Sequence, residues 1–193
     1  MKTASRSLSA VTRWARAHPR AVDVLFATAV GAMSVAGYLT ATTTGSQRDA
    51  DLLGLVLIGI QIAALAARRV APLRSLLVIA ACTVVFWVAD YASDFDAFSI
   101  LAVYAATAHG SQDRRAVWRT VAAAVVLLTT IATIGVLSPD EDLPAAAIIG
   151  IATIHLSAAI VGEVVYDRRR RLSELEQRAV RAEAERELMA RQA

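Results

Sequence analysis

Long apolar runs alternate with short polar loops along the chain, and this alternation predicts the fold class. The six runs lie at about residues 21–42, 52–67, 73–89, 95–108, 117–137 and 144–166. A helix needs about 20 apolar residues to cross about 30 Å of hydrocarbon, and most of the runs come close to that length. We therefore predict an all-α membrane protein: a six-transmembrane-helix bundle followed by a cytoplasmic C-terminal helix.

The fourth run is the weakest, because it is short and carries Ser99 and Thr107. Loop charges support it. Loops rich in Lys and Arg hold Lys2, Arg6, Arg13, Arg16, Arg20, Arg68, Arg69, Arg74, Arg114, Arg115, Arg119 and Arg168 to Arg171. They alternate strictly with loops that hold Arg48, Asp49, Asp51, Asp90, Asp94, Asp96, Asp140, Glu141 and Asp142. Cytoplasmic loops retain Lys and Arg, so we expect six crossings of the cell membrane with both termini in the cytoplasm.

Three segments follow from this pattern. Residues 1–20 form a basic cytoplasmic tail, 21–166 the transmembrane domain, and 167–193 a cytoplasmic linker helix. The basic tail is long for the start of a cleavable signal peptide and further spans follow it, so we expect the first span to be retained.

The segment 167–193 consists almost wholly of helix-forming residues and has no Gly or Pro. In a heptad register that starts at Val165, the apolar seam is Leu172, Leu175, Ala179, Ala182 and Met189, interrupted by Arg168 and Arg186. This seam predicts a coiled coil that joins two copies of the chain. A solvated single helix with internal Glu–Arg pairs is the alternative. In either case span six should continue into this segment as one helical rod.

Composition further narrows the classes of protein to which the chain can belong. Hydrophobic residues make up 56% of the chain, and its mean hydropathy is +0.51. The net charge of +3 comes from short clusters between apolar runs, which is a topology signal and no indication of nucleic-acid binding. Cys82 is the one cysteine, so neither a disulfide nor a cysteine zinc site can form within one chain.

Ionisable residues inside a membrane are costly and are therefore functional candidates. Asp23 begins span one and Glu163 ends span six, at the same predicted depth. We expect them to pair with Arg20 and Arg168 at the interface. A polar contact shared by Asp23 and Glu163 would instead couple the first helix to the last.

His155 lies deep in span six and Gln61 in span two. An imidazole can sense protons or bind a metal, but no second His, Cys or carboxylate stands three or four residues from His155. We expect interhelical hydrogen bonds for both side chains. Small residues four apart, at Ala27/Gly31, Gly59/Ala63/Ala67 and Ala158/Gly162, predict close approach of helices.

Chemistry-bearing motifs are missing from the sequence. It has no glycine loop for phosphates, no Ser/His/Asp or Cys/His set and no cluster of metal ligands. We therefore predict no catalytic residue, no cofactor and no metal site in this chain.

Four stretches resemble a known family: residues 18–23, 67–73, 101–115 and 162–193. They read HPRAVD, an Arg-Arg turn that ends in Ala-Pro-Leu, a helix exit with Gly followed by Arg-Arg, and an Arg-rich linker with LSELEQRA. In this order they look like the membrane input region of DesK/NarL-type sensor histidine kinases of actinobacterial character. The resemblance implies a sensor linked to a dimeric kinase core, with a response regulator as its partner.

One departure from that family bears on activity. Its linker leads to a helix with a phosphoacceptor His followed by Asp, but this sequence stops at residue 193, where that helix is expected. His18, His109 and His155 lack the required context. We therefore expect either the input half of a larger kinase or a natural short relative.

The leading expectation is a sensor and signal-transmission module that responds to lipid state, an apolar molecule or a partner membrane protein. A second possibility is a membrane scaffold that acts through its C-terminal helix. A third is a small transporter, in which Asp23, Gln61, His155 and Glu163 would line one polar path.

Overall fold

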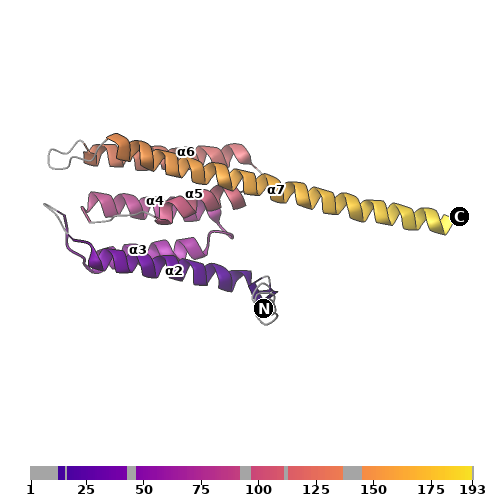
Figure 1. Ribbon diagram of the computed structural model, residues 1–193, viewed down its shortest axis with the longest axis horizontal. Helices are drawn as coiled ribbons and strands as arrows, with labels where there is room; N and C mark the ends of the chain where they lie inside the picture. The colour runs from indigo at the N-terminus through magenta and orange to yellow at the C-terminus, as the bar shows by residue number, and fades with distance from the viewer. Residues whose placement is uncertain are drawn as a thin grey trace, which may run out of the picture.

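The computed structural model describes residues 13–15, 17–42, 47–91, 97–110, 113–136 and 145–192, and within them the fold is helical. Its main helices are α2 (Pro19–Thr40), α3 (Leu52–Ala66), α4 (Pro72–Val88), α5 (Ala97–His109), α6 (Arg114–Val136) and α7 (Ala145–Gln192). Figure 1 shows them side by side as an up-and-down bundle, from which α7 extends far beyond the others. The all-α prediction is confirmed, and each helix falls on one predicted apolar run. The predicted loop acids Asp94, Asp96, Asp140, Glu141 and Asp142 lie outside the described residues.

Local sequence signals set where the helices begin. The carboxylate of Asp51 accepts a hydrogen bond of 3.0 Å from the backbone N–H of Gly54 and so caps α3. Asp113 makes the equivalent contact in front of α6. Pro19 and Pro72 stand at the first turns of α2 and α4, where the missing N–H costs nothing.

Helix α5 is the centre of the bundle. Eight of its 13 residues are buried, and it contacts α2, α3, α4, α6 and α7. Its inward side chains are mostly small, as at Ala102, Ala106 and Thr107, so the neighbouring helices can approach closely. Contacts between α5 and α7 are the most extensive in the bundle. Because the surrounding helices shield α5 from the outer surface, its side chains can be small or polar, and its hydropathy signal is therefore weak.

Two of the three predicted small-residue pairs lie at tight contacts. A β-carbon at Gly162 in α7 would overlap the side chain of Thr107 and crowd the backbone carbonyl of Tyr104, both in α5. A β-carbon at Gly31 would overlap the end of Ile62. By contrast, Gly59 faces open space, and Ala63 and Ala67 of its stripe are exposed.

Two of the described helices are long and apolar enough to cross a membrane, namely α2 and the segment Ile149–Arg191 within α7. Helices α3, α4 and α5 are apolar but shorter, with 15, 17 and 13 residues. At 1.5 Å per residue α5 is about 20 Å long, which is less than the ~30 Å hydrocarbon core.

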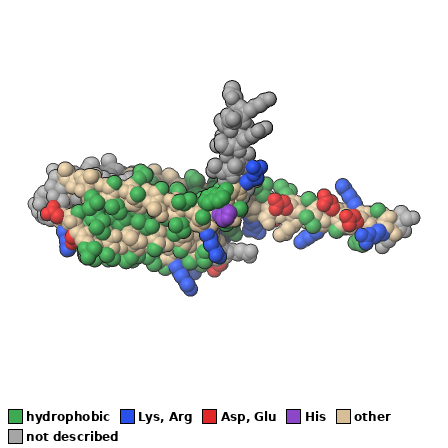
Figure 2. Space-filling model, turned by 90° about the horizontal axis from the view of Figure 1, so that it is seen from below, with side chains coloured by type: hydrophobic (Ala, Val, Ile, Leu, Met, Phe, Trp, Pro, Cys, Tyr) green, Lys and Arg blue, Asp and Glu red, His purple; other side chains and the backbone are tan. Residues whose placement is uncertain are grey.

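The outer surface of the bundle is apolar. Met33, Leu52, Val88 and Val126 are between 65% and 78% exposed. On the face in Figure 2, hydrophobic side chains cover the bundle, while charged ones gather at its two ends and along the protruding rod. An apolar surface of this extent is typical of contact with lipid or with another protein.

Helix α7 runs unbroken for 48 residues, which confirms the predicted rod. Its first half packs against α5 and α6. From Asp167 to Arg191 every residue is exposed, so this half contacts little of the described chain. The predicted boundary at residue 166 coincides with this change.

The contrast between Gly162 and Gly59 predicts opposite effects of one substitution. Gly59→Ala should raise the Tm, because Ala favours a helix interior over Gly by about 1 kcal/mol and nothing obstructs its methyl group. Gly162→Ala should lower the Tm, because overpacking against Thr107 costs about 1–3 kcal/mol. Thermal unfolding in detergent micelles measures both. A Gly162→Ala protein with an unchanged or higher Tm would contradict the tight α5–α7 contact.

Candidate functional site

One end of the bundle gathers most of its charged contacts. The start of α2, the α3–α4 turn, the α5–α6 turn and the point where α7 leaves the bundle lie at this end, which we call the arginine-rich end (Figure 1). The helices bring its side chains together from segments far apart in the sequence.

Asp23 joins α2 to the α3–α4 turn. Its side chain is 5% exposed and forms ion pairs with Arg68, at 2.8 Å, and with Arg69, at 2.9 Å. The Arg68 guanidinium also lies over the Phe26 ring, 4.4 Å from its centroid. The predicted partner Arg20 was wrong, because Arg20 is exposed whereas Asp23 faces the neighbouring turn.

Arg68 is held in an environment that disfavours its charge. Burial lowers the pKa of its guanidinium, and the neighbouring Asp23 carboxylate opposes that effect. Nη2 donates to Asp23, while Nη1 is buried without a hydrogen-bond partner among the described residues. Asp23 is therefore needed to keep this charge at the bundle end.

Glu163 joins α7 to the start of α6. Its carboxylate forms an ion pair with Arg114 and accepts a hydrogen bond of 3.1 Å from the indole N–H of Trp118. Arg114 also donates to the backbone carbonyl of Thr107, at 3.1 Å, and lies 4.0 Å from the Tyr166 ring centroid. One arginine thus links α5, α6 and α7.

The predicted partner of Glu163 was wrong, and the alternative contact with Asp23 is absent from the described residues. Arg168 is exposed, and Glu163 pairs with Arg114 instead. Helices α2 and α7 make no contact in the described structure, so Asp23 and Glu163 share no polar contact. Each carboxylate belongs to its own cluster.

His109 connects the last residue of α5 to the exit of α7. Its Nε2 lies 2.9 Å from Nη1 of Arg169. A guanidinium can only donate, so Nε2 accepts and carries no proton. This contact links the end of α5 to the protruding half of α7.

His155 and Gln61 make the expected interhelical hydrogen bonds inside the bundle. His155 Nδ1 lies 2.8 Å from the Ile151 carbonyl, which can only accept, so Nδ1 donates and Nε2 faces the Ser99 hydroxyl at 2.7 Å. Gln61 donates to the Thr83 hydroxyl at 3.1 Å. No three metal-ligating side chains cluster anywhere in the described residues.

The four candidate polar residues therefore have four separate sets of partners. Asp23 bridges α2 and the α3–α4 turn, Gln61 bridges α3 and α4, His155 bridges α7 and α5, and Glu163 bridges α7 and α6. The structure does not bring them together on one path.

The predicted seam residues face outward from the protruding half of α7. Leu172, Leu175 and Met189 are 52%, 58% and 69% exposed, and Ala179 and Ala182 are exposed as well. Leu188 and Val180, outside the seam, are exposed to a similar degree.

A cluster at the opposite end was not predicted from the sequence. There Asp51 accepts a 2.6 Å hydrogen bond from the Tyr91 hydroxyl and pairs with Arg48 at 2.5 Å, and its backbone N–H donates to the Tyr38 hydroxyl at 2.9 Å. Tyr38, Tyr91 and Phe86 pack with ring centroids 4.9 to 5.7 Å apart. The cluster ties α2, α3 and α4 together. The sequence signal that could have indicated this cluster is a tyrosine near the end of each of two helices, Tyr38 and Tyr91, together with Asp51 at the start of a third.

Titration properties of this cluster follow from its hydrogen bonds. Hydrogen bonds from Tyr91 and from the Gly54 N–H, together with Arg48, hold the pKa of Asp51 below its usual 3.8. Burial and the bond to Asp51 raise the pKa of Tyr91 to about 12. Asp51 is therefore ionised and Tyr91 neutral throughout the physiological range.

Removing the Asp23 carboxylate should destabilise the bundle. Asp23→Asn leaves the largely buried Arg68 charge without its counter-ion, which costs about 3 kcal/mol. The matched control is Glu174→Gln, which breaks an exposed pair with Arg170 worth about 0.5 kcal/mol. Thermal unfolding in detergent should show a clear fall in Tm for Asp23→Asn alone. Equal Tm values for the two variants would contradict a structural role of Asp23.

The lowered pKa of Asp51 predicts how its contribution to the stability of the fold changes with pH. A carboxyl group whose folded pKa lies below 3.8 stabilises the fold above that pH, and the contribution disappears as the pH falls through the folded value. Asp51→Asn should have a lower Tm than wild type at neutral pH. The difference should narrow as the medium is acidified below pH 3.8, whereas the exposed variant Glu176→Gln should match wild type at neutral pH. A difference that widened on acidification would refute this sign.

Comparison with known proteins adds one finding. No curated protein and no solved structure matches the chain. Residues 11–170 match the family described as "Domain of unknown function (DUF7134)", a range that covers the whole bundle and ends where the rod has left it. The chain belongs to this family.

Proposed function

We propose that this chain is the membrane-embedded sensor and signal-transmission module of a two-component histidine kinase. Its six helices cross the cell membrane, and α7 carries changes of helix packing outward to a cytoplasmic kinase core. The proposal assigns no catalytic step and no cofactor to the chain. Its partners are the lipid bilayer, the kinase core and, through that core, a response regulator.

The apolar outer surface supports a membrane location. Leu25, Leu156 and Ile160 are more than half exposed on helices whose inner faces are already occupied. Helices that are apolar on all sides are typical of a lipid environment. The short α5 can still lie within the bilayer, because neighbouring helices surround it and other helices provide the lipid-facing length.

Charge distribution supports the orientation. Arg68, Arg69 and Arg114 lie at the arginine-rich end, and Asp49 and Asp51 lie at the other. Cytoplasmic segments retain Lys and Arg, so the arginine-rich end and the rod are assigned to the cytoplasm.

The observation that carries the proposal is the continuity of α7. One helix is packed against α5 over its first half and exposed over its second half, without a break between them. A rotation, tilt or shift imposed on the packed half therefore reaches the exposed half through an unbroken hydrogen-bonded helix.

Polar contacts at the exit of α7 can differ between two arrangements of the helices and so set the balance between them. Glu163 holds Arg114, Tyr166 lies under the same arginine, and Arg169 reaches His109. Coupling between two packings needs only about 1–3 kcal/mol, which a change in a few such contacts supplies.

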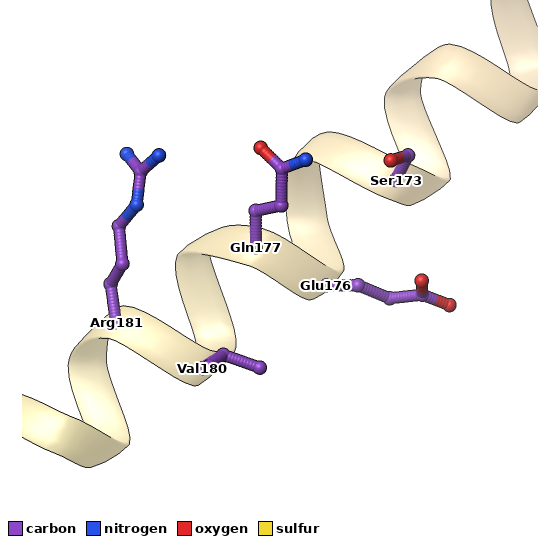
Figure 3. Close-up of a pocket in the computed structure, with 5 residues that line it drawn as sticks. All are labelled: Ser173, Glu176, Gln177, Val180 and Arg181. Carbon is purple, nitrogen blue, oxygen red and sulfur yellow. The ribbon is translucent and has the colours of Figure 1, made fainter.

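A homodimer through the rod is part of the proposal. A groove on the surface of the rod is lined by Ser173, Glu176, Gln177, Val180 and Arg181. Figure 3 shows that all five belong to a single helix, so one side of the groove is open. A second rod, packed on this groove or on the Leu172–Met189 seam, would remove exposed apolar side chains from water.

The test is a fusion of the chain to a two-component kinase core, with one to four alanines inserted between Tyr166 and Asp167. Each inserted residue turns the rod by about 100°. Kinase output should change with one or two inserted residues and return towards wild type with three or four, which complete roughly one turn. Autophosphorylation measures the output. An output that ignored helical phase would sink the proposal.

Topology serves as the control for the fusion. In a Cys82→Ala background, Ser173→Cys in intact cells should resist a membrane-impermeant thiol reagent, whereas Asp49→Cys should react. Reaction at Ser173 would place the rod outside the cell and end the signalling account. The sequence that follows Ala193 in the same reading frame discriminates between the sensor and the scaffold alternative. A kinase helix that carries a phosphoacceptor His there would support the sensor.

A further inference from the structure

Positive charge from three arginines acts on the His109 ring at the arginine-rich end. Arg169 donates to the ring across 2.9 Å from α7. The charges of Arg169, Arg69 and Arg68 all act on the same ring, the last two from the α3–α4 turn. Two segments about a hundred residues apart in the sequence thus direct positive charge to one place.

The carboxylates near these arginines do not balance their positive charge. Asp23 is the carboxylate that pairs with Arg68 and Arg69, and it serves both of them. Among the described residues no carboxylate pairs with Arg169, whose hydrogen-bond partner is the neutral His109 ring. Three cations facing one anion leave a local excess of two positive charges, and their mutual repulsion favours an additional anion.

The cationic groups are accessible. Arg69 has 42% of its side chain exposed although it pairs with Asp23, and Arg169 is exposed. Arg68, by contrast, is 12% exposed and acts as a fixed charge behind them. An anion can therefore approach Arg69 and Arg169 from outside the bundle.

Apolar side chains border the same site. Val70 follows Arg69 directly and is 80% exposed, and Phe26, whose ring lies against Arg68, is 39% exposed. Charged groups that border an exposed apolar surface match a lipid, whose phosphate lies directly above its acyl chains. A free phosphate ion would make no use of the apolar border.

We propose that Arg69, in the α3–α4 turn, and Arg169, at the exit of α7, bind the phosphate of an anionic phospholipid headgroup. Guanidinium groups suit this ligand, because their paired N–H groups match phosphate oxygens. The bound lipid bridges the α3–α4 turn and the exit of α7, so the lipid composition of the inner leaflet biases the position of the rod. This inference rests on the proposed membrane location of the chain.

The experiment titrates the full chain in detergent with phosphatidylglycerol, with phosphatidylcholine and with inorganic phosphate, and counts bound molecules by native mass spectrometry. Wild type should retain phosphatidylglycerol in preference to phosphatidylcholine. Arg69→Gln and Arg169→Gln should each weaken phosphatidylglycerol binding by about fivefold, the effect of one arginine at an anionic surface. Arg169→Lys, which keeps the charge but loses the paired N–H groups, should fall between wild type and Arg169→Gln.

Arg186→Gln is the matched control, because it removes the same charge from an exposed position farther along the rod. It should bind phosphatidylglycerol as wild type does. Equal losses in all three glutamine variants, or no loss in Arg69→Gln and Arg169→Gln, would overturn the site. Displacement of the lipid by inorganic phosphate at similar concentration would overturn the lipid as the source of the phosphate. Circular dichroism verifies that each variant keeps its helix content; Arg169, exposed on the rod, can be replaced without disturbing the bundle.

Failure of this inference is distinguishable from failure of the proposed function. Lipid binding is measured without a kinase core, so a negative result leaves the insertion series and the labelling experiment untouched. Conversely, an output that ignored helical phase would leave a positive binding result standing.

Discussion

The close approach of α5 and α7 determines where most contacts at the arginine-rich end can form. Gly162 leaves room for Thr107, and the two helices then run together to the end of α5. Glu163, the next residue, and Tyr166, one turn beyond Gly162, meet Arg114, and Arg169 meets His109 about one turn later. A wider helix separation would move all of these side chains out of reach of one another, so the steric fit at one glycine sets the electrostatics of the α7 exit.

Polar side chains inside the bundle are satisfied in pairs, and each pair joins two different helices. Gln61 reaches Thr83 and His155 reaches Ser99, so α3 is fixed to α4 and α7 to α5. In surroundings of low polarity an unpaired group is costly, which makes such pairs selective for one arrangement of the helices. Specificity here comes from a few hydrogen bonds and many small side chains, together with buried large ones such as Leu65, Leu76 and Ile79, while other large apolar residues face outward.

Sequence reasoning located the six main helices and the continuous rod, because the length of apolar runs and the charge of loops are local properties. It failed on ion-pair partners. Arg68 stands 45 residues from Asp23, and Arg114 stands 49 residues from Glu163. The order and crossing geometry of the helices bring these groups together, and neither can be inferred from a single stretch of sequence. The Asp51 cluster was missed for the same reason, because Tyr38 lies near the end of α2 and Tyr91 follows α4, and only the fold brings them together.

The length of the rod limits which kind of influence can travel along it. From Tyr166 to Gln192 the helix rises about 39 Å at 1.5 Å per residue. Electrostatic fields in physiological salt decay over about 8 Å. A domain attached beyond Gln192 would therefore be screened from every charge at the bundle end, however those charges were rearranged. Only a mechanical displacement of the backbone, by rotation, bending or translation, can span this gap.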